Sequence, residues 1–173
     1  MSRRISVLLG TMAAVGASLA PVASAPANSK APATQKLAIV GRSEFKVNKL
    51  AFDNQRFSRS AFAIRPGGVV TLVNRAKTED PHTISLVEKA RLPRTFDCEV
   101  CGEIFGAHGA GGENGGPANP VVDVGAPGYD QAGDSTFVAP HARVSFKVTA
   151  PAGTTLHFIC AIHPWMQGRI KVR

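Results

Sequence analysis

The stretch LHFICAIHPWMQGRIKV at residues 156–172 places a loop rich in metal-ligand side chains between two strand patterns. Its first five residues form a run of strand length, and residues 168–172 alternate polar and apolar side chains. The loop between them carries Cys160, His163 and Met166. A thiolate, an imidazole and a thioether suit copper in a trigonal site with a weak axial sulfur. We therefore predict that this loop turns the three side chains toward one point.

Strand patterns also run through the chain before this stretch. Alternating or β-branched runs of strand length lie at residues 45–47, 61–64, 69–73, 83–87 and 143–148. Turn residues separate several of them, as at Pro66-Gly-Gly68 and Ala150-Pro-Ala-Gly153. No helix pattern of convincing length appears after residue 27. The sequence therefore predicts an all-β sandwich or barrel.

Residues 1–27 have the pattern of a secretory signal peptide. Arg3 and Arg4 precede an apolar run that ends in small residues around Ala25. The run of roughly fifteen apolar residues is shorter than the ~20 that a membrane-spanning helix needs. We predict cleavage after Ala27 and export to the periplasm or the extracellular space, and Ser2-Arg3-Arg4 leaves a twin-arginine route open.

Composition and charge narrow the class of protein. The 173 residues are 44% hydrophobic and 18% charged, which fits one compact domain and excludes a disordered chain or a polytopic membrane protein. The net charge of +8 is polarised along the chain. Residues 28–94 hold 13 basic and 5 acidic side chains, whereas residues 95–142 hold 7 acidic side chains and no Lys or Arg. The basic residues lack aromatic interleaving, so nucleic acid is not an expected partner.

Residues 88–135 interrupt the strand patterns. This stretch is rich in glycine, has little periodicity and exceeds the usual loop length of a compact domain. We predict a long Gly-rich insertion there. Residues 28–43 are small and Pro-containing at their start, and we expect them to form a flexible lead-in to a domain over residues 44–173.

His82 supplies a second imidazole, because it follows a polar loop and opens a strand that a sandwich can place beside the C-terminal loop. The chain resembles the cupredoxins, the small blue copper proteins, in three places. These are His82 at the start of its strand, the turn and strand RPGGVVTLVN at residues 65–74, and the loop at residues 158–168. The Cys-x2-His-x2-Met spacing is similar to the short ligand loop of amicyanin and plastocyanin-like members of that family. The resemblance covers about residues 44–87 and 136–173.

The resemblance implies an eight-stranded Greek-key cupredoxin sandwich that holds one type 1 copper ion. It implies His82, Cys160 and His163 as the strong ligands and Met166 as the axial one. Zinc is a weaker alternative, because zinc seldom uses a thioether. The long Gly-rich insertion between His82 and the C-terminal ligand loop departs from the family pattern.

A copper ion in such a site exchanges one electron with little rearrangement, so we expect an electron carrier. Four protein ligands leave no open position for a substrate, which argues against an enzyme. Two other functions stay open: a copper-delivery module with a second metal site, and an accessory subunit of a larger redox enzyme. The expected partner is a redox protein. It docks either at an apolar patch near His163, to which Pro164 and Trp165 contribute, or at the acidic insertion if the partner is basic.

Cys98 and Cys101 form a second chemical feature. In an exported protein we favour a disulfide that closes the start of the insertion and leaves Cys160 as the free thiol. The alternative is half of a second metal site, completed by His108 or His141. Otherwise His108 is expected to be an exposed loop residue and His141 a structural one.

Overall fold

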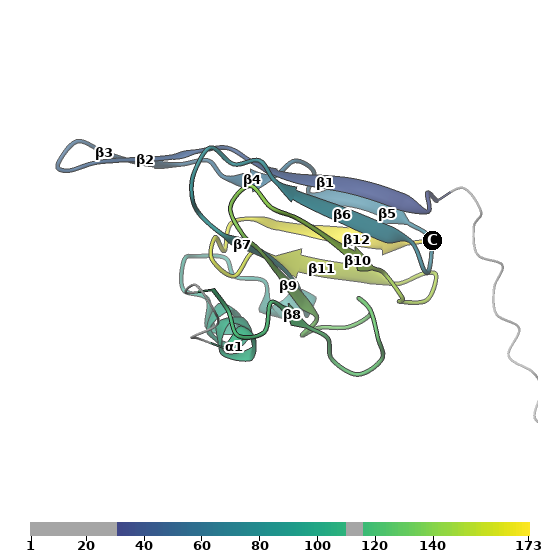
Figure 1. Cartoon of the computed structure of the whole chain (residues 1–173). Helices are drawn as coiled ribbons and strands as arrows, with labels where there is room; N and C mark the ends of the chain where they lie inside the picture. Colours follow the sequence, from purple (N-terminus) through teal and green to yellow (C-terminus); the bar gives the residue numbers. More distant parts are fainter. Residues whose placement is uncertain (1–30, 110–115) are drawn as a thin grey trace, which may run out of the picture.

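The computed structural model describes residues 31–109 and 116–173 of the chain, so the signal peptide predicted over residues 1–27 lies outside the described residues. Two β-sheets pack face to face (Figure 1). The first has the order β10-β6-β1-β4, with bounds β1 Thr34–Val40, β4 Arg56–Phe57, β6 Val69–Asn74 and β10 Arg143–Lys147. The second has the order β5-β12-β11-β7-β9-β8, with bounds β5 Ala61–Ile64, β7 His82–Val87, β8 Val121–Val122, β9 Ser135–Val138, β11 Thr155–Ile159 and β12 Gln167–Val172.

A buried apolar core fills the space between the two sheets. Alternate side chains of the strands point into it, and the members buried to 1% exposure or less include Leu37, Ile39, Ile64, Leu72, Phe158 and Ile170. Burying one such side chain contributes about 1.5–3 kcal/mol, so this core provides most of the stabilisation of the sandwich. The predicted all-β sandwich is confirmed. The described strands outnumber the eight that the family resemblance implied, because short segments such as β4 and β8 extend the sheets.

The first correction concerns residues 28–43, which we predicted to be a flexible lead-in. Residues 34–40 form β1, which pairs in parallel with β6 from Thr34–Val69 to Ile39–Asn74. Leu37 and Ile39 are two residues apart on the strand, so both side chains lie on the face that is buried in the core. The domain therefore includes residues well before residue 44, and the small residues that precede β1 concealed its period-two pattern.

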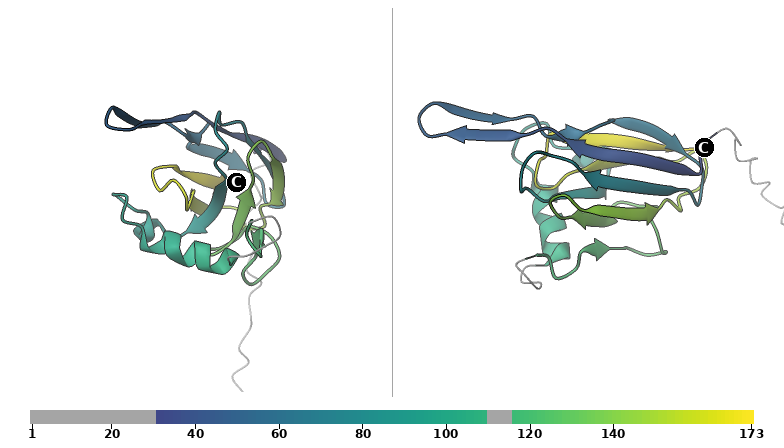
Figure 2. Two further views of the ribbon diagram at one scale, coloured as in Figure 1. Left: turned by 60° about the vertical axis from the view of Figure 1, so that its left-hand side comes forward. Right: turned by 45° about the horizontal axis from the view of Figure 1, so that its top comes forward.

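A β-hairpin projects from the sandwich. Strands β2 Ser43–Lys46 and β3 Leu50–Asp53 pair with each other, and the hairpin extends beyond the end of both sheets (Figure 2). Phe45 is 77% exposed and Phe52 is 38% exposed on it. An arm with exposed aromatic side chains is a candidate contact surface for a partner.

The second correction concerns residues 88–135, which we predicted to be a Gly-rich insertion with little periodicity and which contain a helix that we did not predict. After a 3₁₀ turn η1 Lys89–Arg91, helix α1 runs from Glu99 to His108. Its apolar side chains Val100, Cys101 and Ile104 pack in one cluster with Val87 of β7, Ile159 of β11 and Ala161, which follows β11. Gly102 and Gly106 weaken the helical pattern in the sequence, whereas packing on the sheet stabilises the helix.

Helix α1 explains why every residue of β7 is buried. Side chains on a strand alternate between its two faces. Ile84 and Leu86 join the core between the sheets, and Val87 packs in the separate cluster beneath α1. The second sheet is therefore covered on both faces where β7 runs, which places the first residues of β7 in a site shielded from water.

Candidate metal centre

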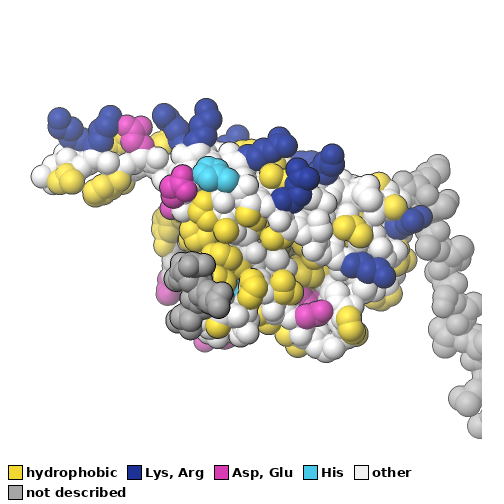
Figure 3. Space-filling view, in the orientation of Figure 1, with side chains coloured by type: hydrophobic (Ala, Val, Ile, Leu, Met, Phe, Trp, Pro, Cys, Tyr) yellow, Lys and Arg dark blue, Asp and Glu magenta, His cyan; other side chains and the backbone are white. Residues whose placement is uncertain are grey.

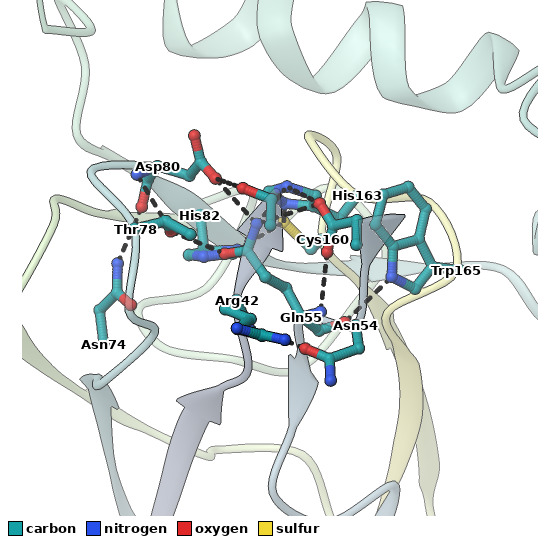
Figure 4. Close-up of polar contacts among 12 residues, drawn as sticks. Arg42, Asn54, Gln55, Asn74, Thr78, Asp80, His82, Cys160, His163 and Trp165 are labelled. Atoms are coloured by element: carbon teal, nitrogen blue, oxygen red, sulfur yellow. Dashed lines mark hydrogen bonds and ion pairs between the residues drawn. The ribbon is translucent and has the colours of Figure 1, made fainter. Parts of the chain in front are cut away.

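Three buried ligand-type side chains meet at one end of the sandwich (Figure 4). His82 opens β7, Cys160 directly follows β11, and His163 lies in the loop between β11 and β12. Cys160 Sγ is 3.6 Å from His82 Nδ1 and 3.8 Å from His163 Nδ1, and the ligand atoms of all three lie within 4.8 Å of one another. The sandwich thus brings His82 within contact of two residues that follow it by 78 and 81 positions.

Hydrogen bonds close the loop that carries two of these residues. The Cys160 N–H donates to Met166 O at 2.9 Å, and the Met166 N–H donates to His163 O at 2.8 Å. Met166 is 1% exposed and belongs to the same buried cluster as Cys160. The tight loop predicted from the seven-residue spacing therefore returns Met166 to the neighbourhood of the thiol.

The spacing of these atoms fits a bound metal ion. Bonds of about 2.0 Å to nitrogen and about 2.3 Å to sulfur, opened to 120°, separate the two ligand atoms by about 3.7 Å. The measured separations of 3.6 and 3.8 Å agree with this value. Both imidazoles present Nδ1 to the sulfur, so each has the same ring atom available as a ligand.

Burial sets the protonation of the three groups in the metal-free protein. Burial, together with the positive charge of a protonated His163, lowers the pKa of His82 to about 4, while the carboxylates of Asp80 and Asp53 oppose the change. Burial also lowers the pKa of His163, while the carboxylates of Asp53 and Asp80 oppose that change. Burial raises the pKa of the Cys160 thiol, and hydrogen bonds from Thr83 oppose the rise. At neutral pH the imidazoles are therefore unprotonated and ready to bind metal, and binding releases the thiol proton.

These pKa values predict an acid sensitivity of the metal-free protein. The His82 pKa is about 4 in the folded chain against 6.5 in the unfolded one, so the unfolded chain binds more protons between these values. The free energy of unfolding is expected to be highest above pH 6.5 and to fall as the pH is lowered toward 4. Denaturant titrations across this range measure it. The His82→Leu variant should show a flatter profile over the same range, and an equally steep one would contradict the assignment.

Gln55 and two carboxylates surround the outer nitrogen of His163, a set that sequence reasoning missed. Gln55 is fully buried, and its Nε2 donates to Asp80 Oδ2 at 2.8 Å and to Asp53 Oδ2 at 3.2 Å. The same Nε2 is 3.2 Å from His163 Nε2. Thr78 donates from its hydroxyl to Gln55 Oε1 at 3.1 Å, which fixes the orientation of the amide. When Nδ1 of His163 is the ligand atom, its Nε2 carries the proton, and the Asp53 carboxylate, with Oδ2 at 3.7 Å, is the acceptor beside it. No local sequence signal marks these residues.

Thr83 contacts the thiol from the side of β7. Its backbone N–H donates to Cys160 Sγ at 3.4 Å, and its Oγ1 accepts a hydrogen bond from the Ala161 N–H at 2.8 Å. Thr83 therefore fixes both Cys160 and the residue after it. Its position next to His82 was the only sequence hint to this role.

The structure keeps the remaining predicted residues apart from this centre. Cys98 and Cys101 form a disulfide with an S–S distance of 2.01 Å, so this pair is not an open metal site. His108, which we expected to be exposed, is 2% exposed because it ends α1 against the second sheet. His141 lies on the surface and pairs with Glu79 at 3.0 Å. The structure does not bring His108 or His141 to the cysteine pair.

Trp165 covers the His163 side of the centre. The two rings meet edge to face with centroids 5.0 Å apart, and the Trp165 Nε1–H donates to Gln55 O at 3.0 Å. Phe96 packs against the same indole at 5.5 Å. Trp165 is 43% exposed and the preceding Pro164 is half-buried, so an aromatic side chain connects the buried imidazole with the surface.

Comparison with solved structures returns cupredoxins. Auracyanin from Roseiflexus castenholzii is 19% identical with a TM-score of 0.45, covering 83% of this chain and 98% of its own. A purple cupredoxin from Nitrosopumilus maritimus is 16% identical with a TM-score of 0.42, covering 80% and 99%. Auracyanin A from Chloroflexus aurantiacus, described as a "blue" copper protein, is 17% identical with a TM-score of 0.39, covering 80% and 99%. No protein-family model and no curated protein sequence matches the chain.

Proposed function

We propose that this protein is a cupredoxin-type electron carrier that holds one copper ion between His82, Cys160 and His163, with Met166 as a weak axial ligand. The observation that supports it is the convergence of a buried thiol and two buried imidazoles at separations that fit a metal ion. One thiolate, two imidazoles and a thioether form the donor set of a blue copper electron-transfer site. When bound there, copper supplies a one-electron couple.

The protein itself restricts the movement of these ligands and shields them from water. All three are buried, and the loop hydrogen bonds of Cys160 and Met166 limit their movement. A site that changes little between oxidation states exchanges electrons without a large rearrangement. Because four protein ligands leave no place for a substrate, we propose no enzymatic reaction here.

In the alternative of a copper-delivery module, the same ligands hold copper for transfer and Cys98 and Cys101 add a second metal site. These sulfurs are bonded to each other, which favours the electron carrier. The test is a redox titration of the copper-loaded full chain with visible and EPR spectra. We expect one copper per chain, an intense thiolate-to-copper absorption, and reversible one-electron cycling with the metal retained. A colourless complex, or loss of copper on reduction, would contradict the proposal.

We propose that the redox partner docks beside Trp165, in the groove between that indole and the projecting hairpin. The groove has a volume of about 470 Å³, and Phe45, Ala51, Phe52 and Phe96 contribute to its walls. Glu44 and Asp53 line the groove, whereas the basic side chains Arg42, Lys46 and Lys49 belong to the same hairpin segment without lining it. Figure 3 shows Lys and Arg along the outer side of the hairpin and hydrophobic side chains on its other side. This surface fits a partner with an apolar contact area and an acidic rim.

The acidic insertion is less suited to docking, because several of its carboxylates are used within the protein. Asp134 is fully buried and accepts hydrogen bonds from the backbone of Val124, Asp130 and Gln131. Glu103 forms an ion pair with Arg91 at 2.6 Å. We therefore favour an acidic partner at the hairpin over a basic partner at the insertion.

Charge reversal on the hairpin tests this docking surface. The double variant Lys46→Glu and Lys49→Glu is expected to slow oxidation of the reduced protein by ferricyanide about tenfold at low salt and to speed oxidation by the cation tris(phenanthroline)cobalt(III), because fields steer charged reactants. Stopped-flow rates against ionic strength measure both effects. The matched control is the charge reversal Lys147→Glu with Lys171→Glu, two exposed side chains near those ends of β10 and β12 that point away from the ligand loop, which should change neither rate by more than about twofold. Larger effects from the control than from the hairpin would overturn the proposal.

We also propose that the protein works outside the cytoplasm. The residue pattern at positions 1–27 supports export. The Cys98–Cys101 disulfide supports an oxidising compartment as well. Among the described residues, no helix has the length and apolar character to cross a membrane.

A further inference from the structure

We infer that helix α1 of the insertion is part of the metal centre, because a buried hydrogen-bond chain connects its last residue, His108, with the hydrogen bonds of Cys160. This inference rests on the proposed copper function. His108 Nε2 is 2.7 Å from Ser135 Oγ, Ser135 Oγ is 2.7 Å from Ser85 Oγ, and Ser85 donates to Thr83 Oγ1 at 2.9 Å. Thr83 then hydrogen-bonds Cys160 Sγ through its N–H.

The chain follows directly from the strand register. Ser85 of β7 and Ser135 of β9 are paired residues, so their side chains lie side by side on the same face of the sheet. Thr83 lies two residues before Ser85 and therefore on the same face. This is the face that α1 covers, so His108 at the end of the helix lies over Ser135.

Every link of the chain is shielded from water. Thr83 and Ser85 are fully buried, Ser135 is 1% exposed and His108 is 2% exposed. His108 Nδ1–H donates to the backbone carbonyl of Asn119 at 2.6 Å. Because Ser85 gives its one proton to Thr83, Ser135 donates to Ser85 and His108 Nε2–H donates to Ser135, so the continuous chain uses both ring nitrogens of His108 as donors. Each hydroxyl therefore depends on its neighbours for hydrogen bonding, because water does not replace a lost partner.

A purely structural role for these four polar residues is a poor explanation. Burying a hydroxyl or an imidazole costs free energy unless it is hydrogen-bonded, and the neighbouring surface beneath α1 is apolar. Apolar residues in the same positions would stabilise the helix contact without this requirement. The polar chain instead ends at the one residue, Thr83, that hydrogen-bonds both Cys160 Sγ and the Ala161 N–H.

The hydrogen-bond chain acts on the metal ligands through Thr83, which it holds in position. If Ser85 is removed, Thr83 Oγ1 loses a donor and the strand can shift at the point where its N–H meets the sulfur. A weaker hydrogen bond leaves more electron density on the thiolate, which favours the oxidised metal. The reduction potential is therefore expected to fall when the chain is broken.

The Ser85→Ala variant of the full-length protein tests the middle of the chain. In the metal-free protein, hydrogen exchange of the Thr83 amide followed by NMR should accelerate about tenfold, since one net hydrogen bond is worth about that factor. In the copper-loaded protein, the oxidised-to-reduced ratio should shift up to about tenfold, which is about 59 mV for a one-electron couple. The thiolate-to-copper absorption band should move with it. His108→Leu should change all three in the same direction, and His108→Gln should restore them in part.

Tyr129→Phe is the matched control. Tyr129 is 3% exposed and its hydroxyl hydrogen-bonds Ile84 O and Thr136 Oγ1, on the same two strands, but it has no link to Cys160. The Tyr129→Phe substitution should lower the melting temperature and leave the amide exchange of Thr83 and the reduction potential unchanged. If Ser85→Ala and His108→Leu also lower only the melting temperature, the inference is wrong. If the unsubstituted protein forms no coloured copper complex, the proposed function fails, whereas the exchange measurement on metal-free protein still decides whether the chain holds Thr83.

Discussion

Replacing Cys160 by serine is expected to abolish the intense visible absorption of the copper-loaded protein and to lower copper affinity by more than about 100-fold. Loss of a partner outside the ligand set typically costs 10–100-fold, and Cys160 is the thiolate ligand itself. Serine is close to cysteine in size, so the fully buried position keeps its packing while losing the soft donor. Copper binding by competition with a chelator, together with the visible spectrum, measures both effects.

The other two cysteines provide the control for this experiment. Cys98→Ser with Cys101→Ser removes the disulfide at the start of α1 and leaves Cys160 in place. This variant should keep the absorption. Loss of so short a ring costs little stability, whereas the serine hydroxyl at buried position 101 lowers the free energy of unfolding by about 1–3 kcal/mol. A colour that survives Cys160→Ser, or that disappears with the disulfide, would contradict Cys160 as the thiolate ligand.

Gly168→Ala is expected to lower the free energy of unfolding by about 3 kcal/mol, the upper part of the range for overpacked cores. A Cβ at this position of β12 would lie 2.3 Å from Phe158 Cζ and 2.7 Å from Ser60 O. Phe158 is fully buried between Phe57 and Phe62 and has no room to move away. Because Gly168 follows Met166 by two residues, copper affinity should fall as well.

Gly102→Ala is the matched substitution in α1. An added Cβ there meets no atom within 4 Å, so alanine should raise the free energy of unfolding by about 0.5–1 kcal/mol through its better helix propensity. Denaturant titrations of both variants measure the difference. Equal effects of the two substitutions would show that the close approach of Phe158 to β12 is not as described.

The two corrections to the fold have one physical cause. Residues 34–40 and helix α1 both have weak local patterns, the first behind Pro-containing small residues and the second among glycines. Their conformations depend on contacts made far along the chain, β1 with β6 and α1 with β7 and β11. Such contacts override local propensity, so neither element was predictable from its own residues.

The site shows the same division between local and distant information. Cys160, His163 and Met166 were found because one loop carries three ligand types in seven residues. His82 was found through its place before a strand and its resemblance to a family pattern. Gln55 and Asp80 were missed, because Gln55 reaches His163, and Asp80 reaches Gln55, only after distant segments fold against the ligand loop.

The sequence by itself determined the class of fold and the chemical types that can form the centre, because strand periodicity and ligand spacing are local properties of the chain. Only the tertiary structure decided which residues act on those ligands. Pairing of β7 with β9 aligns Ser85 with Ser135, and packing of α1 on that face adds His108. The hairpin likewise acquires its position beside Trp165 only in the folded sandwich. Register and packing join residues that are separated along the chain, which no local pattern records.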